Sequence, residues 1–254
     1  MFDRKLKKPI LKDFFTGRAI ILIGARQVGK TTLVQDLQDD LSGEYQIKYL
    51  NLDNLADLEK LTDVNFEDLH NLFSDIDIII IDEAQRLQSI GIVLKLLVDN
   101  YKKSKQVIVT GSSSINLLDF TSEPLTGRKF EYFLYPLSFS EMSAQNGLLD
   151  ELRLVEQRLI FGYYPEVVTS PGKEKEILKL LSDSYLYKDI LKAGLVKKPP
   201  VLEKIVQALA LQLGNEVSFA ELAQLTGVDN ATVERYVDLL EKSFVIFKIP
   251  SLSR

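Results

Sequence analysis

A glycine-bordered loop carries the residues whose types and spacing are best suited to chemistry. Residues Gly24–Thr31 read GARQVGKT, which fits the pattern G-x-x-x-x-G-K-[ST] in full. Glycines let the backbone curl until successive N–H groups face one anion, and the helix expected next adds its positive N-terminal end. Lys30 supplies a point charge for β- and γ-phosphates, and the Thr31 hydroxyl can ligate Mg²⁺. The segment therefore predicts a P-loop for ATP, the alternative being a chance glycine loop near a lysine.

The predicted phosphate contacts cover the whole loop and the start of the following helix. They are Gly24, Ala25, Arg26, Gln27, Val28, Gly29, Lys30, Thr31 and Thr32. Arg26 has two interpretations, because an arginine here can contact a phosphate or a partner, or can remain solvated with its stem along the surface.

Two carboxylates follow the most apolar stretch of the chain. Asp82 and Glu83 come directly after the isoleucine run Ile78–Ile81. Beside a P-loop, an aspartate at a strand end can hold Mg²⁺ (the Walker B role), and a glutamate after it can orient and polarise the attacking water. Alternatively, both acids cap the next helix, since acids favour helix N-termini. The complete P-loop favours the first interpretation.

A third polar cluster follows the apolar segment Gln106–Val109. If that segment lies between the strands at 19–23 and 77–81, Thr110 or Ser112 faces the γ-phosphate and can hydrogen-bond it or the water. We take Ser112 as the candidate sensor. The alternative is a serine-rich turn that caps a short helix.

The reaction class follows from what accompanies the P-loop. No N/T-K-x-D segment is present, so guanine recognition is not expected. An Asp-Glu pair at a strand tip favours water activation over transfer to a small-molecule acceptor. The sequence therefore predicts an ATPase.

Strands and helices alternate along the first half of the chain. Strands are predicted at 19–23, 47–52, 77–81, 106–109 and 129–134, and helices at 30–41, 65–73 and 83–101. This alternation predicts an α/β fold, in which a parallel sheet has helices on both faces, for a P-loop domain over residues 1–136.

The second half of the chain is predicted to be helical. Helical periods without a convincing strand define a region over 137–213. In the segment 214–254, Ser218 and Asp229 can cap two helices, Gly227 lies in the turn between them, and an apolar strand follows. This predicts a winged helix-turn-helix that is truncated before the returning strand of its wing.

The composition excludes several kinds of site. A net charge of −5 argues against a general nucleic-acid coat. With no cysteine and one histidine, His70, disulfides, thiolate sites and histidine-rich metal sites are excluded. No apolar run predicts a membrane span or a signal peptide, so a soluble cytoplasmic protein is expected.

Six segments together resemble a known family. GARQVGKTTL, IIIIDEAQR, VTGSSS, LTGRKFEYFLYPLSFSE, FGYYPEVV and YLYKDI occur in this order. The chain is similar over nearly its whole length to prokaryotic AAA-type ATPases with an AAA_14 domain followed by a DUF4143 region. The resemblance implies a P-loop ATPase with Lys30 and Thr31 at the phosphates and Mg²⁺, and a C-terminal nuclease-like part that is absent here.

The resemblance implies further residue roles. Asp82 becomes the Walker B acid, Glu83 the base and Ser112 a sensor, while Arg128 is the candidate transition-state arginine. The alternative for Arg128 is a surface ion pair, for instance with Glu131.

The tract Gly162–Pro165 corresponds to a glycine-x-proline nucleotide sensor of related signalling ATPases. Family members often have a second glycine where Tyr163 stands. A tyrosine is costly there if the backbone needs a positive φ.

Three functions remain open at this point. The first is an Mg²⁺-dependent ATPase whose turnover moves the helical region. The second is a slow nucleotide-loaded switch that signals by presenting a surface to a partner, either an unidentified protein or a further copy of the chain. The third is a DNA-associated regulator. It is not favoured, because the second helix of the helix-turn-helix carries Glu234, Asp238 and Glu241 against Arg235 and Lys242, and acidic groups repel phosphates.

Overall fold

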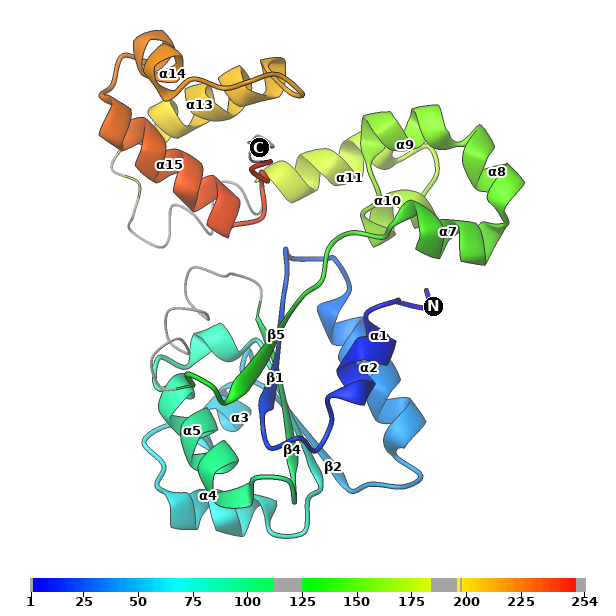
Figure 1. Ribbon diagram of the computed structural model, residues 1–254, viewed down its shortest axis with the longest axis vertical. Coiled ribbons are helices and arrows are strands. Elements are labelled where there is room, and N and C mark those ends of the chain that lie inside the picture. The colour runs from blue at the N-terminus through cyan, green and yellow to red at the C-terminus, as the bar shows by residue number, and fades with distance from the viewer. Residues whose placement is uncertain (1, 112–124, 184–195, 197, 250–254) are drawn as a thin grey trace, which may run out of the picture. The chain divides into compact units, whose positions relative to one another are not determined.

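The computed structural model describes residues 2–111, 125–183, 196 and 198–249 (Figure 1). The chain divides into two compact units, Met1–Glu174 and Lys175–Arg254. The three-part division at 1–136, 137–213 and 214–254 stays a prediction. In the part of the chain that is described, no helix has the length and apolar character needed to cross a bilayer.

The first unit is built on a five-stranded parallel sheet. The strands lie in the order β2-β3-β4-β1-β5. Their bounds are β1 Ala19–Ile23, β2 Ile47–Asn51, β3 Ile78–Asp82, β4 Gln106–Gly111 and β5 Lys129–Phe133. All five predicted strands are confirmed, and β4 lies between β1 and β3 as the candidate site requires. Because the strands are parallel, their carboxyl ends meet at one edge.

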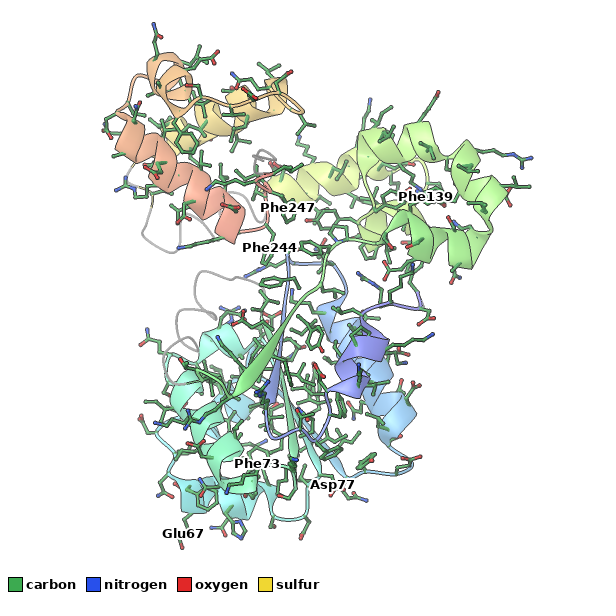
Figure 2. All side chains as sticks on the ribbon, viewed as in Figure 1. Glu67, Phe73, Asp77, Phe139, Phe244 and Phe247 are labelled. Atoms are coloured by element: carbon green, nitrogen blue, oxygen red, sulfur yellow. The ribbon has the colours of Figure 1, made fainter. Side chains whose placement is uncertain are left out.

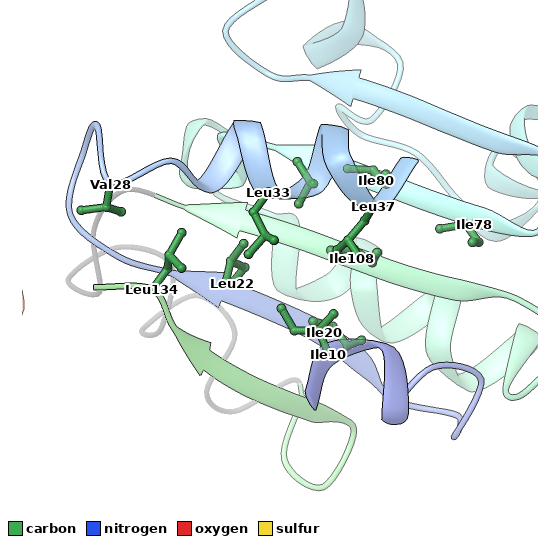
Figure 3. Packing of buried hydrophobic residues seen from close by; sticks show 11 residues of the cluster. Ile10, Ile20, Leu22, Val28, Leu33, Leu37, Ile78, Ile80, Ile108 and Leu134 are labelled. Atoms are coloured by element: carbon green, nitrogen blue, oxygen red, sulfur yellow. The ribbon is translucent and has the colours of Figure 1, made fainter. Parts of the chain in front are cut away.

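Helices cover both faces of the sheet because alternate strand residues face opposite sides. Figure 1 shows α1 and α2 on one side and α3, α4 and α5 on the other. Even-numbered residues of the central strands pack with α1 (Lys7–Lys12) and α2 (Lys30–Leu41), as Figure 3 shows. This cluster contains Ile10, Ile20, Leu22, Val28, Leu33, Val34, Leu37, Ile78, Ile80, Ile108 and Leu134.

The helices on the opposite side are α3 (Leu55–Glu59), α4 (Phe66–Phe73) and α5 (Ile90–Tyr101). On α4, Phe73 is buried, whereas Glu67 faces solvent (Figure 2). The prediction of one helix over 83–101 was wrong. Glu83 has a left-handed backbone and Leu87 is extended, so the segment splits into a 3-10 turn, η1 (Ala84–Arg86), and α5.

Four short helices follow the sheet within the first unit. They are α7 (Phe139–Asn146), α8 (Leu148–Arg153), α9 (Val155–Phe161) and α10 (Pro165–Thr169). A capping box starts α7, because the Ser138 hydroxyl accepts from the backbone of Glu141 and the Glu141 carboxylate accepts from the Ser138 N–H. Pro165 begins α10, where its missing N–H costs nothing.

The second unit consists of helices in its described residues. They are α11, which begins at the boundary (Glu174–Leu181), α13 (Pro199–Leu211), α14 (Phe219–Thr226) and α15 (Asn230–Lys242). Ser218 caps α14, Asp229 caps α15, and Gly227 ends α14 with a φ of 71°, as predicted. The apolar strand of a wing is not confirmed, since the described residues 243–249 form no strand.

Candidate active site

The P-loop connects the carboxyl end of β1 to the start of α2. A Cβ on Gly24 would lie 2.2 Å from the carbonyl oxygen of Leu134, so only glycine fits this close approach. Gly29 has a φ of 95°, a left-handed backbone that glycine adopts without strain. The loop also turns at Gln27, whose φ is 58°. Sequence spacing and backbone geometry therefore agree on both glycines.

Lys30 is buried at the first turn of α2. Its Nζ donates to the carbonyl oxygens of Gly24 at 2.9 Å and Ala25 at 2.8 Å. Burial lowers the pKa of Lys30 to about 8, although the nearby charges of Glu83 and Asp82 act in the opposite direction. The ammonium is thus held next to both acids in a site whose burial makes its proton easier to lose. An arriving anion would raise this pKa and stabilise the charged form.

Asp82 accepts hydrogen bonds from hydroxyl groups on three neighbouring elements. Its Oδ2 accepts from Thr31 Oγ1 at 2.8 Å and from Tyr49 OH at 2.6 Å, and its Oδ1 accepts from Thr110 Oγ1. β3 lies between β2 and β4, which brings Tyr49 and Thr110 to the same strand end. The structure thus brings together Thr31 and Asp82, the two residues predicted to hold Mg²⁺.

Glu83 begins the turn after β3 with a φ of 56°. A left-handed backbone costs a glutamate about 1 kcal/mol, and such strain is concentrated at functional sites. The Glu83 N–H lies 3.2 Å from Asp82 Oδ1 and 3.3 Å from Thr110 Oγ1. The Glu83 carboxylate accepts a hydrogen bond from the side-chain amide of Gln85. Glu83 is therefore adjacent to Lys30 and Asp82 but is engaged by Gln85.

Arg128 lies at the opposite edge of the sheet. It precedes β5, and its carbonyl oxygen accepts from the Ala19 N–H, at the amino end of β1. A five-residue strand separates this edge from the P-loop by roughly 16 Å. Arg128 pairs with Asp99 at 2.5 Å, not with Glu131 as the alternative had it. Within its own chain, Arg128 therefore lies at the sheet edge opposite the P-loop.

The remaining predicted residues divide into placed and unplaced ones. Ser112 lies outside the described residues, whereas Thr110 is fully buried beside Asp82. Arg26 is close enough to Lys30 for its charge to lower the pKa of that lysine. Thr32 faces a cavity of about 50 Å³ that Leu33 and Pro165 also line.

The tyrosine in the glycine-x-proline tract fits without backbone strain. The positive φ of 75° belongs to Gly162, and Tyr163 is not among the described residues with positive φ. The carbonyl oxygen of Tyr163 accepts from the Leu137 N–H at 2.9 Å. Pro165 therefore reaches the cavity beside Gly29 even with a tyrosine at position 163.

Two residues that contact this site were missed by the sequence reasoning. Tyr49 binds Asp82, and burial followed by the hydrogen bond to Asp82 raises the pKa of its hydroxyl. The guanidinium of Arg4 donates to the P-loop carbonyl oxygen of Val28 at 2.7 Å. Neither carries a local signal, because one is an ordinary strand residue and the other lies 24 residues before its partner.

Two protein-family models match parts of this chain. Residues 16–143 match the AAA domain family AAA_14. Residues 152–254 match DUF8612, a domain of unknown function, so the expected DUF4143 region is not confirmed.

Relatives occur in bacteria and archaea. An uncharacterized protein of Haemophilus influenzae is 27% identical over 249 residues, which cover 90% of this chain and 61% of that protein. The uncharacterized protein MJ1544 of Methanocaldococcus jannaschii is 22% identical over 260 residues, covering 92% and 56%. The chain thus spans about half to three fifths of the length of such relatives.

A solved structure shares the fold. The Walker-type ATPase Paby2304 of Pyrococcus abyssi superposes with a TM-score of 0.61 at 16% identity, covering 96% of this chain and 90% of that one. The family match includes the P-loop, the Asp82-Glu83 pair and the five strands that position them. The chain belongs to the AAA_14 family of AAA domains.

Proposed function

We propose that this chain binds ATP together with Mg²⁺ at the P-loop and hydrolyses it. One observation carries the proposal: the Thr31 hydroxyl and the Asp82 carboxylate lie 2.8 Å apart beside the buried ammonium of Lys30. A hard-cation ligand pair and a desolvated positive charge at the carboxyl edge of one sheet suit a metal-bound triphosphate.

The donor set fits Mg²⁺. In the described residues, no group of three or more acidic or histidine side chains could hold a metal ion by itself. That agrees with Mg²⁺, which proteins usually hold through one or two carboxylates together with substrate phosphates and water. Thr31 and Asp82 would hold the ion. When bound, it neutralises charge that develops on the transferred phosphoryl group.

The other residues of the site bind the phosphates, activate the attacking water and sense the γ-phosphate. The N–H groups of the loop from Gly24 to Thr32 surround the phosphates, and Lys30 adds its charge. Glu83 orients the attacking water and accepts its proton, which requires that its carboxylate leave Gln85. Ser112, which follows Gly111 in the sequence, senses the γ-phosphate.

Glu83→Gln separates an ATPase from a slow switch. An ATPase loses about 10²- to 10⁴-fold in turnover when its general base is removed, while it still binds ATP. The measurements are phosphate release and equilibrium ATP binding, with Glu131→Gln on the exposed edge strand β5 as the matched control. Turnover that is equal in the two variants would contradict the role of Glu83.

Arg128 can contribute to catalysis only at the site of a second copy. A mixture of Arg128→Ala and Glu83→Gln chains tests this, because a mixed assembly would contain a site with an intact base and a donated arginine. Activity that appears only on mixing supports donation in trans. Two variants that stay unaffected by mixing exclude it.

The alternative functions have their own tests. A conformational response would change protease cleavage between residues 175 and 254 when ATP is added. A DNA-associated role predicts binding that weakens with salt. Lys242 is bonded to Asp238 at 3.2 Å and Lys248 to Glu241 at 2.9 Å, so acids accompany both lysines and DNA reading is not favoured.

A further inference from the structure

Arg4 contacts the P-loop at Val28 and Gly29. Its guanidinium makes three hydrogen bonds: Nη1 to Val28 O at 2.7 Å, Nη2 to Tyr135 O at 2.6 Å and Nε to Glu141 Oε1 at 3.1 Å. The arginine is only 8% exposed. A planar fork of donors suits such a set of acceptors, which a lysine cannot satisfy together.

Glu141 fixes the guanidinium in place. Its Oε1 also accepts from the Lys5 N–H at 2.9 Å, and its Oε2 accepts from the Ser138 N–H at 2.8 Å. Burial alone would raise the pKa of Glu141, but these hydrogen bonds and the Arg4 charge hold it below its ordinary value. The carboxylate is therefore an anchor that is itself held by α7 and by the N-terminal segment.

The bond to Val28 determines where the next N–H points. In a trans peptide the C=O and the following N–H point in opposite directions, and no described peptide bond is cis. Because the Val28 carbonyl oxygen is directed to Arg4, the Gly29 N–H is directed away from Arg4. The Val28 side chain is buried in the core cluster, so this peptide is held from two directions.

We propose that Arg4 is a positioning residue that holds the Val28–Gly29 peptide of the P-loop in its anion-binding orientation. The inference rests on the proposed nucleotide site. Arg4 acts on the loop through the Val28 carbonyl group, so the proposed role requires no contact between the guanidinium and the phosphates. Its loss therefore weakens binding of the phosphate chain, independently of the base.

A buried ion pair elsewhere in the same unit provides a matched control. Arg158 and Glu151 are 2.9 Å apart with side chains 9% and 0% exposed. In the described residues, the guanidinium of Arg158 bonds Glu151 and lies over the Tyr163 ring, outside the P-loop. The test compares Arg4→Lys and Arg4→Met with Arg158→Lys and Arg158→Met. Binding of ATP and of inorganic tripolyphosphate is measured by calorimetry, and folding by thermal unfolding.

Arg4→Lys is the decisive variant because it keeps the charge and can keep the ion pair to Glu141, so it is expected to fold. We expect Arg4→Lys and Arg4→Met to bind ATP and tripolyphosphate at least about tenfold more weakly than wild type, as for one lost charge-assisted hydrogen bond. The Arg158 variants bind both ligands as wild type does.

Three other outcomes would overturn the proposal. If Arg4→Lys binds ATP as wild type does, the arginine contributes only charge and the positioning role is wrong. If the Arg4 variants lose ATP but keep tripolyphosphate, Arg4 serves the nucleoside and the proposal is overturned. If wild type and the Arg158 variants bind neither ligand, the nucleotide site itself is refuted, and this inference with it.

Discussion

The buried ammonium of Lys30 predicts that ATP binding takes up protons above neutral pH. Without nucleotide, burial holds the pKa of Lys30 at about 8, well below the ordinary value of 10.5. Phosphates placed beside the ammonium favour the charged form, so the pKa rises when ATP binds. Wherever free Lys30 is neutral, binding must therefore be accompanied by protonation.

The magnitude follows from the lowered pKa. Free Lys30 is about 10% neutral at pH 7 and about 90% neutral at pH 9, so uptake rises from about 0.1 to about 0.9 proton per ATP. Over the same interval the apparent affinity falls about tenfold, because only the charged fraction binds without proton uptake. Phosphate groups have a second pKa near about 6, so at pH 7 the protonated fraction of the nucleotide, about 10%, is as large as the uptake by Lys30, whereas at pH 9 it is about 0.1% and the uptake belongs to Lys30.

Calorimetry of ATP binding in two buffers with different ionisation enthalpies measures the uptake directly. Unfolding of the free protein provides an independent check. Because the unfolded chain binds more protons between pH 8 and 10.5, the stability of wild type relative to Lys30→Met should rise over that window, by up to about 3 kcal/mol. If ATP binding takes up no proton at pH 9 and the ATP affinity is the same at pH 7 and pH 9, Lys30 is not a buried ammonium that contacts the phosphates.

Three further predictions concern the surroundings of the site. Gly24→Ala should destabilise the protein by about 3 kcal/mol in urea unfolding and abolish ATP binding, because the added methyl group would lie 2.2 Å from a carbonyl oxygen. The control Gly43→Ala has free space for the methyl group and should change stability and binding little. Equal effects of the two substitutions would contradict this prediction. Tyr49→Phe should cost about 1–2 kcal/mol in the same assay through the lost hydrogen bond to a carboxylate, with ATP affinity changed less than about threefold; unchanged stability would show that the bond does not form. Arg128→Ala should change stability by less than about 1 kcal/mol, because its ion pair is exposed, and a larger loss would indicate a structural role.

The sequence was sufficient to predict the sheet because its strands are short, apolar and separated by helical periods. The P-loop and the Asp82-Glu83 pair were predictable for a related reason, since their chemistry depends on adjacent residues whose spacing is visible. The turn after Glu83 was not predictable. The apolar residues keep a helical spacing through this segment, although the backbone leaves the helical conformation at the positive φ of Glu83. Spacing reports which face is apolar and not whether every residue is helical.

Contacts between distant segments account for the other differences. Arg128 looked suitable for catalysis by its type and its tract, but the parallel pairing of β5 with β1 puts the residue before β5 at the sheet edge opposite the P-loop. Arg4 and Tyr49 reach the site through pairings that no local pattern records. The strand of the predicted wing is not confirmed in residues 243–249, where Phe247 and Ile249 are exposed and their apolar character did not lead to burial in a sheet.

Equilibrium binding of Mg²⁺-ATP to the purified chain tests the central claim most directly. The account predicts one ATP per chain, with binding lost in Lys30→Met and retained in Lys95→Met, whose lysine is exposed on α5. Failure of the wild-type protein to bind ATP, or equal binding by both variants, would contradict it.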